Sequence, residues 1–190
     1  MHSERRRWRL LGFSFRIARR RPVIATVIPQ NLMSVPSSLP ELASVQRVLL
    51  LTGLVGVEDV VAWADSEIET SDVPANTLID LAMSRSKSPY EVAALLRQLS
   101  SDPNDKTGIK HAFRIIADRV RSNAMDIETA IMSVYNFLRD ENLLYGDDEF
   151  LTFCVLEDEC ADIRDGVYGN GDLTVLRNPL LDALDKIAAT

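Results

Sequence analysis

Apolar side chains recur at helical spacing along most of the chain after residue 38. In each segment they fall three or four residues apart, which places them on one side of an α-helix. The clearest segment contains Ile109, Phe113, Ile116 and Val120, at intervals of four, three and four residues. The pattern predicts helices at about 39–51, 57–69, 89–100, 108–122, 127–142, 148–163 and 179–188, and a short additional helix after Pro74.

Residues typical of helix starts precede several of these segments. Ser38 with Pro40, and Ser88 with Pro89, place a capping hydroxyl and an early proline before an apolar pattern. Asp126 predicts another start, and the pair Asn178–Pro179 predicts the last one. Short apolar pieces such as 173–176 are the only candidates for a strand, so the sequence predicts an all-α protein.

The segment 148–163 has an unusual distribution of apolar residues. Between Phe150 and Leu156 only Thr152 is polar. A helix that is apolar nearly all the way round is normally interior, with other helices packed about it. We therefore expect a single-domain bundle of seven or eight helices around a central apolar helix at about 148–163.

Charge is divided unevenly along the chain. Residues 1–32 contain eight arginines and one acid, whereas residues 33–190 contain 13 bases and 27 acids, a net charge of −14. We interpret residues 1–32 as a flexible extension or a wrongly assigned start, and residues 33–190 as an acidic helical domain. The alternative is a basic arm that touches an acidic partner or this protein's own body. The acidic body disfavours binding to nucleic acid or to an anionic membrane.

Two cysteines, Cys154 and Cys160, lie in the predicted central helix. The helical rise between them is about 9 Å, beyond the ~7 Å that a disulfide can span between α-carbons. We expect buried thiols in a reducing compartment, and therefore a cytoplasmic protein. Neither zinc-ligand spacing nor a phosphate-binding loop nor a nucleophile motif occurs, so we expect no cofactor and no metal.

Glu157 is the most specific single candidate for a site residue. It shares a helix face with Phe153 and Cys154, so it is expected at the edge of the core. A carboxylate in that position must be paired, hydrogen-bonded or protonated. Two interpretations stay open: Glu157 pairs with an arginine of a neighbouring helix, or it is a functional acid in a pocket.

Further acids follow Glu157 in the same helix: Asp158, Glu159, Asp162 and Asp165. They predict a solvated acidic face that could contact a partner protein. Asp158 and Asp162 are also one helical turn apart, a spacing that two-carboxylate metal sites use. The Glu-x-x-His pattern of di-metal helical bundles does not occur, which favours the solvated face.

Residues 60–82 carry a resemblance to a known group of proteins. Trp63-Ala64-Asp65, Ile68, Pro74 and Leu78-Ile79-Asp80-Leu81 resemble the opening of small all-helical bacterial proteins of unassigned function, some of which are immunity proteins of polymorphic toxin systems. The acidic helix before a glycine turn at 150–169 is similar to that group as well, and the likeness covers at most residues 40–188. The resemblance implies a protein that binds and blocks a cognate toxin.

These observations lead to two functional hypotheses, and a purely structural or self-associating helical domain is a third possibility. The first is a non-enzymatic, cytoplasmic bacterial protein that binds another protein, such as a basic toxin, through its acidic surface. Its expected contact residues are Asp65, Glu69, Glu157, Asp158, Glu159, Asp162 and Asp165. The alternative is a helical enzyme or a divalent-metal-binding protein that uses the carboxylates of 157–165.

Overall fold

The apolar patterns of the sequence form helices throughout the part of the chain that the structure describes. The computed structural model describes residues 38–100, 105–144, 148–167 and 171–189. The helices are α1 (Leu39–Leu51), α2 (Val57–Thr70), α3 (Asn76–Ala82), α4 (Pro89–Leu99), α5 (Lys106–Arg121), α6 (Ile127–Asp140), α7 (Asp148–Arg164), the 3-10 helix η1 (Leu173–Leu176) and α8 (Arg177–Ala189). The prediction of an all-α bundle is confirmed, whereas residues 1–32 lie outside the described residues.

Capping side chains set most of the predicted starts. The Ser38 and Ser88 hydroxyls accept hydrogen bonds from the backbone N–H groups of Glu41 and Glu91, and both serines belong to capping boxes. The Asp126 carboxylate accepts from the Thr129 N–H at 2.8 Å.

The last helix starts differently from the sequence prediction. Residues 173–176 form a 3-10 turn rather than a strand, because the Asp172 carboxylate caps them by accepting from the Thr174 N–H at 2.9 Å. α8 then follows at Arg177 without a break, so the predicted cap at Asn178 is wrong.

Two hydrophobic clusters share α1. Ala43 and Leu50 belong to one cluster, which α1 forms with α2, α3 and α4. Val45, Val48 and Leu49 belong to the other, which α1 forms with α5, α6, α7, η1 and α8. α1 is therefore apolar on two sides and connects the two clusters.

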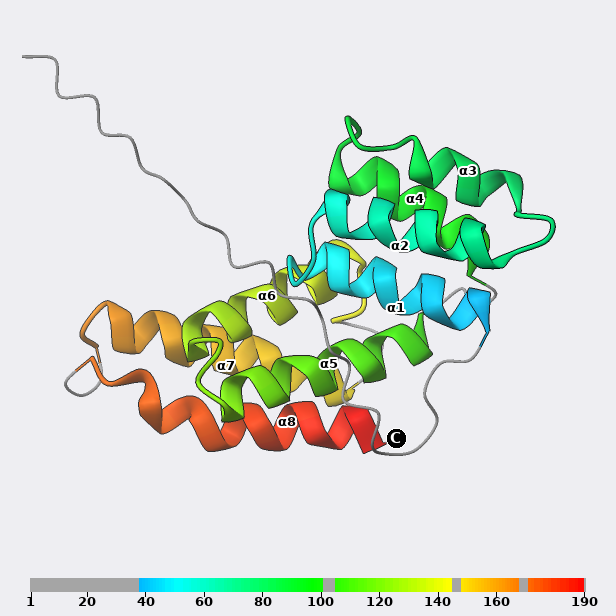
Figure 1. Cartoon of the computed structure of the whole chain (residues 1–190). Coiled ribbons are helices and arrows are strands. Elements are labelled where there is room, and N and C mark those ends of the chain that lie inside the picture. Colours follow the sequence, from blue (N-terminus) through cyan, green and yellow to red (C-terminus); the bar gives the residue numbers. More distant parts are fainter. Residues whose placement is uncertain (1–37, 101–104, 145–147, 168–170, 190) are drawn as a thin grey trace, which may run out of the picture. The chain divides into compact units, whose positions relative to one another are not determined.

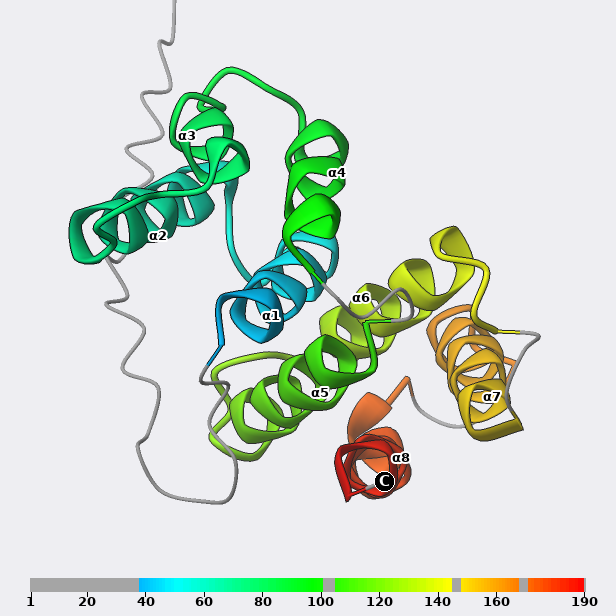
Figure 2. The ribbon, with the colours of Figure 1, turned by 90° about the vertical axis from the view of Figure 1, so that its right-hand side faces the viewer.

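The helix α5 lies between α1 and α8 (Figures 1 and 2). It buries Gly108, Ala112 and Ala117 among its larger apolar residues, and such small side chains let neighbouring helices approach closely. The closest approach is at Gly108, whose N–H donates a hydrogen bond to the Ser44 hydroxyl of α1 at 3.2 Å.

Gly108→Ala is expected to destabilise the protein, although alanine normally stabilises a helix relative to glycine. A Cβ at this position would lie 2.5 Å from the Ser44 carbonyl oxygen, which is backbone and cannot turn away. Overpacking of this kind costs about 1–3 kcal/mol. Urea denaturation measures the change, and an increase in the free energy of unfolding would contradict the close contact.

The predicted central position of the helix at 148–163 is wrong. α7 buries one side only, with Phe153, Leu156, Cys160 and Ile163, while Leu151 and Val155 are exposed. The physical reason is the acidic half of the same helix, because complete burial would take its carboxylates out of water. The inner positions belong instead to α1 and α5, which pack against each other.

Candidate protein-binding surface

Apart from Glu157, the predicted contact acids of this region lie on the solvent-facing side of α7 or, for Asp165, directly after its end. Asp158, Glu159 and Asp165 are exposed and Asp162 is half-buried. Asp165 accepts a hydrogen bond from Arg164, at 3.5 Å, and Arg164 also bonds Glu128 of α6 at 3.3 Å. These two acids raise the pKa of the Arg164 guanidinium, Asp165 most strongly.

Asp165 has a base beside it in the described part of the chain, whereas three other acids there have none: Asp158, Glu159 and Asp162. Within residues 38–100, 105–144, 148–167 and 171–189, no ion pair or hydrogen bond engages any of the three carboxylates. Three neighbouring negative charges on one helix therefore face the solvent without compensation, and they attract positive charge in solution.

Glu157 lies at the edge of the core, as the sequence predicts. The residue is half-buried, like Cys154 and Ala161 on the same flank of α7. The expected arginine partner is not found, since none of the ion pairs in the described part of the chain includes Glu157. Its negative charge, together with that of Glu128, adds to the effect of burial in raising the pKa of the Cys160 thiol.

Asp65 and Glu69 are also exposed, but on another helix. They lie in α2, which packs in the cluster of α1, α3 and α4, whereas α7 packs against α6, α8 and η1. The structure therefore brings Asp158, Glu159 and Asp162 together on one surface and leaves Asp65 and Glu69 outside it.

The described residues contain two cysteines and many acids, the residue types that could act as nucleophiles or metal ligands. Cys154 and Cys160 are free thiols, and burial is the main cause of the raised pKa of Cys160, which keeps this thiol protonated. No group of three or more His, Cys, Asp or Glu side chains there converges in a way that could hold a metal ion.

A buried ionic cluster, which the sequence did not predict, links α1 to the start of α5. We call Ser44, Arg47, Asp105 and Glu141 the α1–α5 ionic cluster. The Arg47 guanidinium pairs with the Asp105 carboxylate and, at 2.6 Å, with Glu141 at the end of α6. The Ser44 hydroxyl donates to Asp105 at 3.0 Å. A basic residue among the apolar positions of α1 was the one signal available in the sequence.

Asp105 occupies an unusual position in this cluster. It is the N-cap of α5 and has φ +50°, in the left-handed region, which aspartate tolerates better than most residues. Burial raises the pKa of the Asp105 carboxyl, and the charge of Arg47 and the hydroxyl of Ser44 offset part of that effect. The cluster therefore positions α1 against α5. Its one partly exposed member is Glu141, which also lies 3.9 Å from the exposed Arg97.

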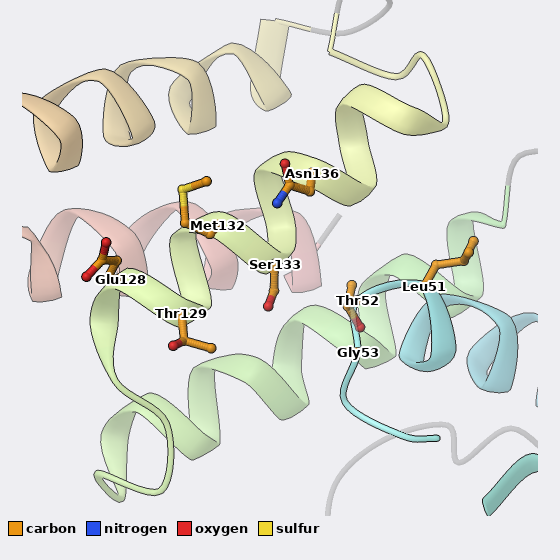
Figure 3. Close-up of a pocket in the computed structure, with 8 residues that line it drawn as sticks. All are labelled: Leu51, Thr52, Gly53, Glu128, Thr129, Met132, Ser133 and Asn136. Carbon is orange, nitrogen blue, oxygen red and sulfur yellow. The ribbon is translucent and has the colours of Figure 1, made fainter. Parts of the chain in front are cut away.

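A shallow pocket of about 450 Å³ opens on another side, between the end of α1 and the outer face of α6 (Figure 3). Its lining residues are Leu51, Thr52, Gly53, Glu128, Thr129, Met132, Ser133 and Asn136. The Thr52 hydroxyl donates to Val48 O and the Thr129 hydroxyl to Asp126, so both already have partners. None of the predicted site residues lines this pocket.

Comparison with known proteins assigns no relationship: no protein-family model, no curated protein and no solved structure matches the chain. The resemblance of residues 60–82 to immunity proteins therefore stays a prediction. None of the helices in the described residues is both long enough and apolar enough to cross a membrane.

Proposed function

We propose that this protein acts by binding another protein, and that the solvent-facing side of α7 is the contact surface. The observation that supports the proposal is the set of uncompensated carboxylates of Asp158, Glu159 and Asp162. Exposed acids are common on protein surfaces, but three of them together on one helix form a local negative patch. Acids that stay unpaired on one helix face are suited to a positively charged partner, whose approach they accelerate.

The class of partner follows from the charge of the chain. The chain has a net charge of −7, and residues 33–190 account for −14, so a basic protein is attracted to this acidic part in general as well as to α7. A basic toxin that attacks nucleic acid has this property, because it must bind phosphates. The protein would then act as an immunity-type inhibitor that covers the basic surface of the toxin.

Capture from extracts of the native host tests the proposal with the full chain as bait. We expect one dominant basic protein at low salt and its release as salt rises, because screening weakens charge attraction. Asp158→Asn combined with Asp162→Asn should reduce the recovery severalfold. The matched control is Asp80→Asn combined with Asp182→Asn, which changes the net charge equally on α3 and α8 and should leave recovery near the wild-type level.

Two results would contradict the proposed function. One is the capture of no protein at low salt, and the other is equal loss of binding in the α7 variant and the matched control. The inhibitory role has its own test: co-expression with the captured protein should relieve any growth arrest that the captured protein causes. Continued arrest, with binding intact, would leave a binding protein that is not an inhibitor.

A further inference from the structure

The solvent-facing side of α7 carries apolar residues as well as acids, in a single line. Leu151 and Val155 are 42% and 54% exposed, although the opposite side of the helix is buried in the core. We define the α7 stripe as Leu151, Val155, Asp158, Asp162 and Asp165, which follow one another at intervals of four, three, four and three residues. Residues so spaced lie along one face of a helix. Asp165 is the first residue after α7 and continues its last turn, because the Asp165 N–H donates to the Ala161 carbonyl oxygen at 2.9 Å.

We propose that the α7 stripe is the seam on which an amphipathic, basic α-helix of the partner protein docks. This inference rests on the proposed function and names the element of the partner that α7 binds. Apolar side chains of that helix cover Leu151 and Val155, and its lysines or arginines face Asp158 and Asp162. Asp165, which Arg164 already pairs, lies at the end of the stripe.

The spacing favours a helix as the occupant. Alternation of three- and four-residue intervals is the pattern along which two α-helices pack side by side. An extended peptide would instead need a free sheet edge, and the described residues contain no strand. Leu151 and Val155 add an apolar contact to the charge attraction, since removing exposed apolar surface from water favours binding.

The charges exclude a second copy of α7 as the occupant. In a parallel pair the aspartates of one stripe would face the aspartates of the other. In an antiparallel pair the apolar residues of each copy would face the aspartates of its partner, which would lose water without gaining a base. A helix with apolar residues at one end and basic residues at the other satisfies both halves of the stripe.

Synthetic peptides and the full chain test the inference without knowledge of the partner. One peptide is a helix of alanine, leucine and lysine, with leucines and then lysines placed at the spacing of the α7 stripe. The second peptide has the same composition and charge, but its leucines and lysines are spread around the helix. Fluorescence anisotropy at low salt should show about tenfold tighter binding of the first peptide. Equal binding of the two peptides, or binding of neither, would contradict the proposal that the α7 stripe docks a helix.

Variants of the protein separate the apolar contact from the charges. Leu151→Ser combined with Val155→Ser should weaken binding of the matched peptide about tenfold. The control is Val73→Ser combined with Met83→Ser, which removes exposed apolar residues outside α7 and should leave binding unchanged. Circular dichroism of each variant checks that it is folded. Peptide binding that is unaffected by the Leu151 and Val155 substitutions would also contradict docking on the α7 stripe.

The host capture experiment distinguishes failure of this inference from failure of the proposed function. If wild-type protein captures a salt-sensitive partner that the Leu151 and Val155 variant binds equally well, the seam is wrong and the binding function stands. If no partner is captured at all, the proposed function fails and the seam fails with it. Support for both requires capture that is lost in the apolar variant and retained in the Val73 and Met83 control.

Discussion

Arg47→Met is expected to lower the free energy of unfolding by about 3–5 kcal/mol at neutral pH. The substitution removes the guanidinium that pairs with both Asp105 and Glu141, and its side chain is almost fully buried. Methionine fills much of the same volume, so the loss comes mainly from a buried carboxylate without its cation. Urea denaturation monitored by circular dichroism measures it.

The loss in Arg47→Met should depend on pH in a defined direction. Because burial raises the pKa of Asp105 in the folded protein, the contribution of this group is fully present below about pH 4 and is lost as pH rises through the folded pKa. In Arg47→Met the pKa of Asp105 rises further, so the loss of stability that this carboxyl causes continues to a higher pH. The difference between wild type and variant should therefore be smaller near pH 4 than at neutral pH. Equal differences at both pH values would contradict the role of Asp105.

A double substitution supplies the control for this prediction. Arg47→Met combined with Asp105→Asn should be more stable than Arg47→Met alone, because the second change removes the unpaired buried charge. Asparagine also tolerates the left-handed backbone at this position. A double variant that is less stable than Arg47→Met would show that the carboxylate is not the source of the loss.

Phe113→Ala is expected to cost about 3–5 kcal/mol of unfolding free energy. The Phe113 ring is fully buried and makes edge-to-face contacts with Phe137 of α6 and Phe153 of α7, with ring centroids 6.4 and 5.7 Å away. Its removal leaves a cavity where three helices meet, and both neighbouring rings lose a contact.

Thermal and urea unfolding measure the Phe113 effect against a matched aromatic control. Tyr90→Ala removes a ring that is 68% exposed at the start of α4, and it should change stability by less than about 0.5 kcal/mol. Similar losses in the two variants would contradict the position of Phe113 at the centre of the larger cluster.

The helices themselves could be predicted because their causes are local. The spacing of Ile109, Phe113, Ile116 and Val120 defines α5, and all four side chains are buried in the structure. The capping boxes at Ser38 and Ser88 begin α1 and α4 where the sequence places them. The start of α8 was predicted wrongly because the 3-10 turn at 173–176 continues directly into the helix, and no strong sequence pattern marks such a turn.

The candidate site could be predicted only in part. Its acids are visible in the sequence, and Glu157 does lie at the edge of the core. The pairing of Arg47 with Asp105 was not predictable, because the two residues are 58 positions apart and meet only when α1 packs on α5. The pattern also could not show that Asp65 and Glu69 lie on a helix that packs in another cluster.

The all-α class, the approximate helix boundaries and the acidic charge of residues 33–190 could be read from the amino-acid order, since these depend on local spacing, capping and composition. Which side of each helix is covered is known only from the packing of the helices against one another. α7 has apolar residues on two sides, and one of these sides packs against α6, α8 and η1 while the other stays exposed. The acids of α7 keep their own side in water, but the helices that cover the other side meet α7 only in the folded protein. The exposed side, with Leu151 and Val155 beside the acids, is therefore a result of packing.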